Sequence, residues 1–403
     1  MKLEAQLTSP RTQANHGVVS MIRETRPGVV CFLLAAVVAA SIGNPTASAA
    51  QADPTTAQTQ ATLTRIRNEL FAGTSRPDEA IRSLKAILAA EPDSAEAHML
   101  LGIAYRTAGT ADLLGEAVAE LRQALALNPA FIPARFYLAH IYLELGRYER
   151  AREELNAALA DSPRNAQVLT LLGEVERLLR NPQRSLDVLK QALEIDASSA
   201  QAHYYVGLTL FDLGRPAEAI TELERVVRSG EKRADVYLSL GAAYLESGRL
   251  DEGLEILSQA TRIDPARADI RLQVARAYRL KGMLDKADAQ LKIAVPQGPA
   301  SVASPFVQQR QLEHDRFEEL GLLRLQQGQL TAAADAFLKL LEMDPTHGPT
   351  NRNLAEAYLR QGQYARALDY ATRAEKLGSP VSDDKRKLIQ DGLRKQKTPG
   401  SAR

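Results

Sequence analysis

Six histidines and several adjacent acidic pairs are the residues of this chain whose types could do chemistry. The histidines are His16, His98, His140, His203, His314 and His347, and no two of them are four residues apart. Two imidazoles on one helix turn need that spacing to share a metal ion, so the pattern does not predict a metal site. Glu153 and Glu154 point about 100° apart on a helix and stand among arginines, which is typical of a solvated face.

The sequence also lacks the short motifs of common catalytic sites. It contains no Gly-rich loop before Lys-Ser/Thr, no H-E-x-x-H and no G-x-S-x-G. The net charge of +1 argues against a general binder of nucleic acid or acidic lipid, and the single cysteine, Cys31, excludes an intramolecular disulfide. We therefore expect a protein that is not an enzyme and that uses no cofactor or metal.

Small residues recur along the chain at a fixed interval. One series consists of Ala80, Ala117, Ala151, Ser185, Ala219, Gly253, Ala287, Ala333 and Ala367, and most neighbours in it are 34 residues apart. Apolar residues between them return after three and four positions, which predicts helices. In the clearest copy, Ile132–Pro163, Gly146 separates two helices and Pro163 ends the second. Helical pairs this short must stack on neighbours to bury their apolar faces, which predicts a solenoid.

With this pattern the chain resembles the tetratricopeptide repeat (TPR) family. The family's series of leucine, glycine, tyrosine, small residue, leucine and proline stands here, for example, as Leu240, Gly241, Tyr244, Gly253, Leu257 and Pro265. About nine units match, and the first is the poorest copy. The family's tryptophan is replaced by His98, Arg135, Leu169, His203, Tyr237, Arg271, Phe317 and Asn351. The resemblance implies an all-α, right-handed TPR-type α–α solenoid with a C-terminal capping helix.

The N-terminal segment has the features of an export signal. Arg23 and Arg26 precede the apolar run Val29–Ile42, and Ala47-Ser48-Ala49 then forms an A-x-A cleavage pattern. The run is shorter than the roughly 20 residues that span a bilayer, so we predict a cleaved signal peptide. An uncleaved membrane anchor is the alternative.

The composition predicts the following organisation. A signal peptide covers 1–49, with Met21 as an alternative start, and a flexible linker covers 50–62. Seven TPR units cover 63–299, and an insertion or hinge covers 300–313, for which a longer first helix is the alternative. Two further units cover 314–380, a capping helix covers 381–395, and a disordered tail covers 396–403.

In TPR-like solenoids the first helices line a concave groove that takes a peptide or a partner helix. Helical phase places eight residues on this face: Phe136, His140, Tyr204, Leu208, Phe211, Leu238, Arg276 and Arg279. An apolar strip with arginines at one end fits an amphipathic segment that ends in acidic residues or a carboxylate. The alternative is that these side chains pack against neighbouring first helices and contribute only to the core.

These features together favour an exported, non-enzymatic scaffold or adaptor of the bacterial cell envelope, periplasmic or secreted, that binds a protein partner and no nucleic acid. The resemblance implies roles such as assembly of a secretion, pilus or exopolysaccharide system. The alternative is an assembly factor anchored in the inner membrane through an uncleaved Val29–Ile42.

Overall fold

The computed structural model describes residues 54–294 and 305–397. Within these ranges the chain forms nineteen helices and no strand, and consecutive helices pack as pairs. The prediction of an all-α, TPR-type solenoid is confirmed. The predicted signal peptide 1–49 and residues 398–403 of the predicted tail lie outside the described residues.

Each unit contains a first and a second helix. The first helices are α2 (Pro54–Phe71), α4 (Ala95–Ala108), α6 (Ile132–Glu144), α8 (Ala166–Leu178), α10 (Ala200–Asp212), α12 (Ala234–Glu246), α14 (Ala268–Leu280), α16 (Pro305–Gln326) and α18 (Gly348–Arg360). The second helices are α3 (Pro77–Ala90), α5 (Ala111–Leu127), α7 (Tyr148–Asp161), α9 (Pro182–Ile195), α11 (Pro216–Arg228), α13 (Leu250–Ile263), α15 (Leu284–Ile293), α17 (Leu330–Met343) and α19 (Tyr364–Lys376). Helix α20 (Asp383–Lys397) follows the last unit.

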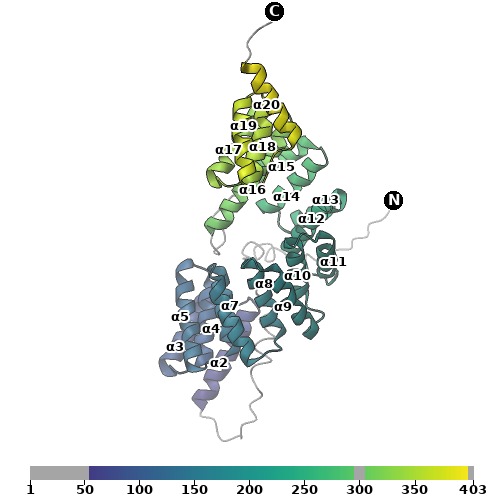
Figure 1. Cartoon of the computed structure of the whole chain (residues 1–403). Helices are drawn as coiled ribbons and strands as arrows, with labels where there is room; N and C mark the ends of the chain where they lie inside the picture. Colours follow the sequence, from purple (N-terminus) through teal and green to yellow (C-terminus); the bar gives the residue numbers. More distant parts are fainter. Residues whose placement is uncertain (1–53, 295–304, 398–403) are drawn as a thin grey trace, which may run out of the picture.

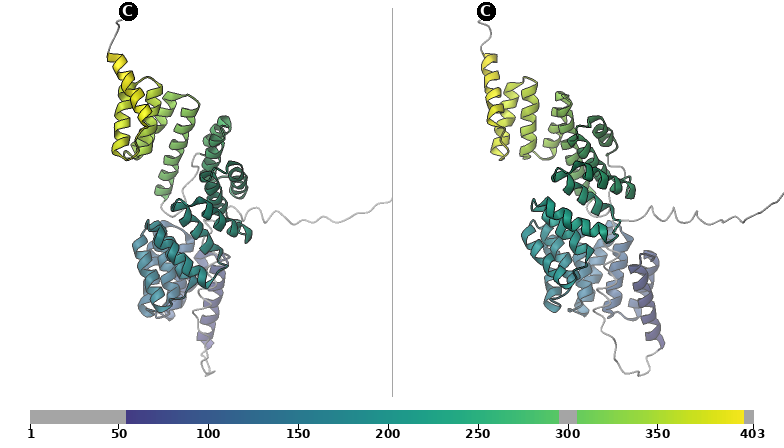
Figure 2. Two further views of the ribbon diagram at one scale, coloured as in Figure 1. Left: turned by 45° about the vertical axis from the view of Figure 1, so that its right-hand side comes forward. Right: turned by 90° about the vertical axis from the view of Figure 1, so that its right-hand side faces the viewer.

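The pairs stack in sequence order into an elongated array. Figure 1 shows α2 to α9 in its lower part, α10 to α13 in the middle and α14 to α20 above them. The two turned views in Figure 2 show the same order from other sides. Helix α20 packs on α19, where Ile389 is fully buried against the last unit. A polar-faced helix at the end of a solenoid covers the apolar surface that the next unit would otherwise bury.

Within each unit a small residue of the first helix faces a large side chain of the second. A Cβ atom added to Gly173 would lie 2.4 Å from Cγ of Leu189, and one added to Gly321 would lie 2.4 Å from the ring of Phe337. Neither neighbour has room to give way without repacking the pair. The recurring small residues of the sequence are therefore contact points at which the two helices cross.

In two units a histidine replaces the family's tryptophan and bridges a carboxylate of its own second helix and a carbonyl oxygen of the loop before its first helix. In the first, His98 Nδ1 lies 2.6 Å from the Glu120 carboxylate, and Nε2 lies 3.0 Å from the Pro92 carbonyl oxygen. His203 repeats both contacts, with distances of 2.6 Å to Glu222 and 3.1 Å to a backbone carbonyl oxygen. The second-helix carboxylate and the loop before the first helix are thereby tied together.

Arginine makes the same bridge in two other units. Arg135 donates to the Glu154 carboxylate at 2.9 Å and to the Pro129 carbonyl oxygen at 2.8 Å. Arg271 donates to the Gln290 side chain and the Pro265 carbonyl oxygen, both at 3.2 Å. We call these four side chains the polar clips. They explain why the missing tryptophan leaves the fold intact: directed hydrogen bonds replace its packing.

The polar clips lead to a test with a matched pair of variants. His98→Ala should lower the free energy of unfolding by about 1–2 kcal/mol, because the loop carbonyl and Glu120 lose their shared partner. His98→Arg should stay close to wild type, because arginine already fills this slot in two other units. Urea unfolding followed by circular dichroism measures both. Equal losses in the two variants would show that the bridge contributes nothing.

Two predicted boundaries need correction. Helix α2 already begins at Pro54, so residues 54–62 of the predicted flexible linker are helical. Ala57, Gln58, Gln60 and Ala61 are exposed, so this part of α2 carries no apolar period, yet it continues the helix that Leu63 and Ile66 anchor. Gln396 and Lys397 of the predicted tail belong to α20.

The predicted insertion 300–313 falls partly in α16, which begins at Pro305 and is 22 residues long. A longer first helix, the alternative that the sequence left open, therefore describes residues 305–313. Residues 300–304 lie outside the described residues, and a hinge there stays a prediction.

Candidate protein-binding groove

The structure divides the eight predicted groove residues into two sets. Phe136, His140, Tyr204 and Arg279 are buried, with exposed fractions of 1%, 7%, 8% and 9%. Leu208, Phe211, Leu238 and Arg276 are partly exposed. The burial of the first set agrees with packing between neighbouring first helices, and binding of a partner by the predicted groove residues stays a prediction.

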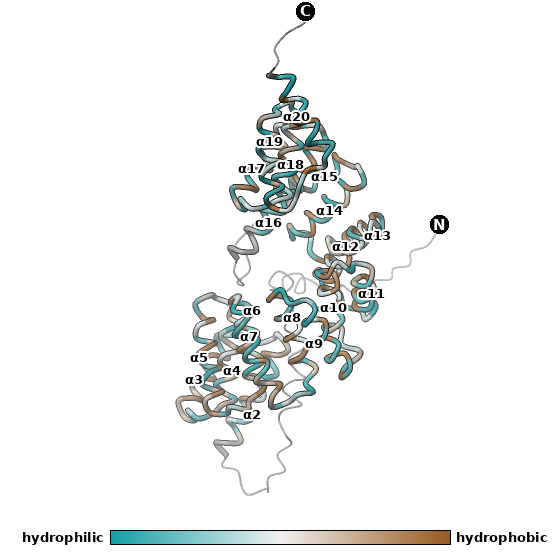
Figure 3. Tube along the Cα trace, viewed as in Figure 1, coloured by the Kyte–Doolittle hydropathy of each residue, from teal (hydrophilic) through white to brown (hydrophobic). Residues whose placement is uncertain are grey.

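Three partly exposed apolar residues come from two adjacent first helices. Leu208 and Phe211 of α10 pack at the edge of one core cluster, and Leu238 of α12 packs at the edge of the next. We call these three residues the apolar strip. Figure 3 shows how hydrophobic and hydrophilic residues alternate along the helices of this region. The apolar strip combines backing by the core with surface that remains open to a partner.

The position that Leu238 has in α12 is buried in α4, α6, α8, α10 and α14. Met99 of α4 and Leu272 of α14 occupy the position that Leu238 has in α12, and their exposed fractions are only 1% and 2%. Leu272 packs with Leu312 and Leu323 of α16. Leu238 is therefore more open than its equivalents in these helices, and it joins Leu208 and Phe211 of α10 in the partly exposed strip.

The two arginines that were predicted to receive a partner's carboxylate are paired with acids of this chain. Arg279 donates to both carboxylate oxygens of Glu319 on α16, at 2.7 and 3.1 Å. Arg276 lies 2.5 Å from Glu246 and 3.8 Å from Glu319. An intrachain carboxylate thus takes the place that the sequence assigned to a partner. The pair with Glu319 also joins the units on either side of residues 295–304.

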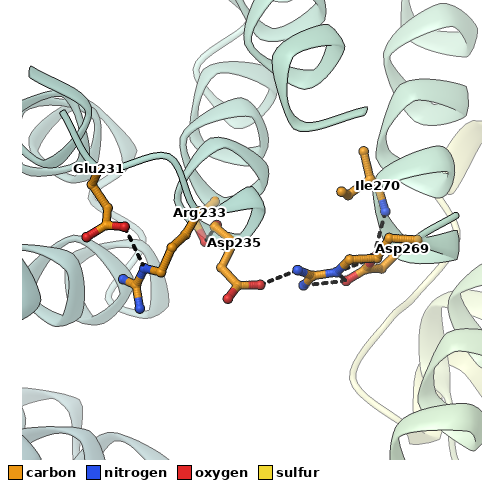
Figure 4. A network of polar contacts seen from close by, with 7 residues as sticks. Glu231, Arg233, Asp235, Asp269 and Ile270 are labelled. Atoms are coloured by element: carbon orange, nitrogen blue, oxygen red, sulfur yellow. Dashed lines mark hydrogen bonds and ion pairs between the residues drawn. The ribbon is translucent and has the colours of Figure 1, made fainter. Parts of the chain in front are cut away.

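A second ionic network follows the starts of α12 and α14, shown in Figure 4. The Arg267 guanidinium lies between Asp235 of α12 and Asp269 of α14 and donates to both. Asp269 also accepts from the backbone N–H of Ile270 at 2.8 Å. Arg233, which lies over the Tyr204 ring at 5.0 Å, contacts the Glu231 carboxylate. These contacts hold neighbouring first helices in register beside the apolar strip.

Burial shifts the pKa of two polar groups of the groove toward the neutral form. Burial, and secondarily the charge of Arg106, lowers the pKa of His140 to about 3. Burial raises the pKa of Glu174 above its ordinary value, although Tyr205 and Arg177 oppose this shift. Among the described residues no group of three His, Cys, Asp or Glu side chains is arranged to hold a metal ion.

Models of known families match most of this array. One tetratricopeptide repeat model matches residues 110–175 and 244–304, and a second matches 69–130, 179–234, 206–268 and 318–381. The chain belongs to the tetratricopeptide repeat family. TPR solenoids are protein-binding scaffolds, and the fold is typically non-catalytic. A search of curated proteins found no match.

Solved structures show the same fold at low sequence identity. The Cut9–Hcn1 hetero-tetramer of the APC/C aligns with a TM-score of 0.58 and 14% identity, over 82% of this chain and 62% of that one. A TPR protein from Parabacteroides merdae aligns with a TM-score of 0.50 and 18% identity, over 66% of this chain and 99% of that one. The human IFIT1 dimer with PPP-AAAA aligns with a TM-score of 0.53 and 19% identity, over 80% of this chain and 73% of that one. This chain therefore spans less than two thirds of the Cut9 complex chain.

One buried hydroxyl beside the groove, that of Tyr137, is not predicted by the sequence pattern. Tyr137 of α6 is fully buried, and its hydroxyl has no hydrogen-bond partner among the described residues. Burial raises the pKa of this phenol well above its ordinary value. The ring of Phe71, at the end of α2, stacks on Tyr137 with centroids 6.3 Å apart. The sequence feature that could have indicated this contact is Phe71, an aromatic residue in the first and poorest copy of the repeat.

Two tyrosines of α6 form a matched test of this unpartnered hydroxyl. Tyr137→Phe should raise the free energy of unfolding by about 1 kcal/mol, because it removes a buried polar atom that has lost water and gained no partner. Tyr142→Phe should lower it by about 0.5–1 kcal/mol, because the Tyr142 hydroxyl accepts from Arg122 at 2.8 Å. Chemical denaturation of both variants measures the difference. A loss of stability in Tyr137→Phe would show that the hydroxyl has a partner in solution.

His140 predicts a defined pH dependence of stability. Its pKa in the folded chain, about 3, lies below the ordinary value of 6.5, so protons bind the unfolded state first as the pH falls. The corresponding stability is complete above about pH 6.5 and is lost progressively toward pH 3, by about 2 kcal/mol between pH 7 and pH 5. His140→Leu should remove this part of the slope in urea titrations. An unchanged slope in that variant would contradict a neutral His140.

Proposed function

We propose that this protein is an exported, non-enzymatic scaffold of the bacterial cell envelope that holds a segment of a partner protein against the apolar strip. The observation that carries the proposal is the partly exposed surface of Leu208, Phe211 and Leu238, supported from below by the core. An amphipathic helix or an extended peptide with apolar side chains is the partner that such a surface recognises.

The charges around the strip shape this recognition. Arg276 and Arg279 are already paired with Glu246 and Glu319, so a carboxylate of the partner would have to compete with the chain's own acids. The partner is therefore held mainly through apolar burial in the strip. Polar contacts at the rim of the strip set the orientation of the bound segment more than its affinity.

Export is part of the proposal and rests on the sequence. Arg23, Arg26, the apolar run Val29–Ile42 and the A-x-A pattern at Ala47 support a cleaved signal and a periplasmic or secreted location. Assembly of a secretion, pilus or exopolysaccharide system is the role that we propose for the scaffold. The alternative is an inner-membrane assembly factor in which Val29–Ile42 is retained. None of the described helices is long and apolar enough to cross a membrane.

The N-terminal sequence of the mature protein separates the two versions. A chain that begins near Ala50 supports the exported form, and a chain that retains Val29–Ile42 supports the anchored form.

The binding surface is tested by affinity capture from a bacterial envelope extract. The double variant Leu208→Asp, Leu238→Asp should reduce recovery of the partner at least tenfold, because two carboxylates must be desolvated in the bound state. The matched control is Ile263→Asp, Leu388→Asp. These two residues are 42% and 58% exposed and lie at the end of α13 and on α20, away from the strip.

Circular dichroism must show that both double variants keep the helical content of the wild type. Capture that survives in the strip variant, or that is lost equally in the control, would contradict the assignment of the strip as the binding surface.

A further inference from the structure

Helix α2 does not pack as the first helix of a regular unit. In the other units the first helix makes its most extensive contacts with the second helix of the same unit, whereas α2 packs more on α4 than on α3. Helix α2 also contacts α6, the next first helix after α4. Phe71 at the end of α2 reaches past α4 and stacks on Tyr137 of α6, with an angle of 16° between the rings.

The face of α2 that meets these helices is that of an amphipathic ligand. Leu63, Ile66 and Leu70 are 3%, 1% and 4% exposed and belong to the same core cluster as Met99 and Tyr137. Beside this stripe, the Arg67 guanidinium lies 3.0 Å from the Glu96 carboxylate of α4. Gln60 reaches the same carboxylate at 3.4 Å. The opposite face, which includes Ala57 and Ala61, is exposed.

The covering of the groove follows the position of α2. Ile103 of α4 and Leu208 of α10 occupy the same place in their helices. Ile103 is 3% exposed, whereas Leu208 is partly exposed. His140 of α6, at the same place, is 7% exposed, and Glu174 of α8 and Ala242 of α12 are partly exposed. The groove is therefore filled where α2 lies and open farther along the array.

The fit of α2 is incomplete at its last residue. The hydroxyl of Tyr137, whose ring stacks with Phe71, is buried with no partner among the described residues. A phenyl ring offers no acceptor, so the contact leaves a desolvated donor unsatisfied. A helix that carried an acceptor at this place would satisfy the donor and keep the rest of the interface.

We propose that α2 is an intramolecular occupant of the groove at α4 and α6, and that the amphipathic helix of a protein partner binds there by taking its place. The proposal rests on the proposed function and names its partner more closely. The replacing helix has apolar residues with the spacing of Leu63, Ile66 and Leu70 and a basic residue for Glu96. Its last position carries an amide or carboxylate that accepts from Tyr137. The full site therefore extends from α4 to α12 once α2 is displaced.

The test uses the whole chain and a fluorescent synthetic peptide with the sequence of residues 54–72. Ile66→Asp in the chain should unseat α2, because a carboxylate cannot enter the core cluster, and so should leave the groove free. The control is Ala61→Asp, the same change on the exposed face of the same helix. Fluorescence anisotropy should show peptide binding at least tenfold tighter to the Ile66→Asp chain than to the wild-type or Ala61→Asp chain. No binding to Ile66→Asp, or equal binding to all three, would overturn the proposal.

Two further measurements place the peptide. A peptide with Phe71→Gln should bind the Ile66→Asp chain more tightly than the unmodified peptide does, and Tyr137→Phe in that chain should abolish the gain. If Ile66→Asp loses helical content by circular dichroism, Arg67→Glu takes its place, since it breaks the ion pair with Glu96 and repels α2 from that carboxylate while the apolar stripe is unchanged. The same order of affinities is then required, and its absence overturns the proposal.

The outcome does not depend on finding the natural partner, because the probe is the chain's own helix. Failure of peptide binding would leave capture by the apolar strip intact. Conversely, loss of the apolar strip as a binding surface would leave the exchange of α2 measurable, so the two failures are distinguishable.

Discussion

The close crossing of two helices within each unit is the constraint on which the rest of the structure depends. At Gly207 and Gly241 an added Cβ would approach Leu223 and Leu257 to 2.7 and 2.6 Å, so only a glycine or a shifted partner fits. This approach sets the angle of the pair, and the angle sets where the next pair can stack. The polar clips then hold the loop and the second helix of four units in place. The groove exists because the first helices, ordered in this way, share one side of the array.

The groove is a series of compartments and not a uniform channel. Helix α2 covers it at α4 and α6, while α16 covers Leu272 and brings Glu319 to the arginines of α14. Between these ends, α10 and α12 keep the apolar strip partly open. Buried groups here, such as the neutral His140, fit recognition by shape and apolar burial better than acid–base chemistry. The arrangement suits a scaffold whose accessible surface depends on what its own first helix covers.

The helices, their order and the capping helix could be predicted from the sequence because their determinants are local. Glycine, alanine and proline at 34-residue intervals mark crossings and ends within one unit. Exposure in the groove is not local. Phe136 and Leu238 occupy the same helix position, but one is 1% exposed and the other is partly open, because their neighbours differ. The partner of Arg279 lies 40 residues away on α16, beyond the reach of a repeat pattern. The helical start of α2 was missed because its exposed residues carry no period.

The polar clips have a consequence for the junctions between units. Each clip joins the second helix of its unit to the loop that closes the unit before it, and this loop carbonyl recurs at the same place in all four cases. The ion pairs Arg106–Glu144, Arg177–Asp212 and Arg279–Glu319 join successive first helices. The first two use the same pair of helix positions, whereas Glu319 comes from a different one. Junctions that share clip and ion-pair positions are therefore equivalent to one another, while the Arg279–Glu319 pair makes the junction between α14 and α16 different from the rest.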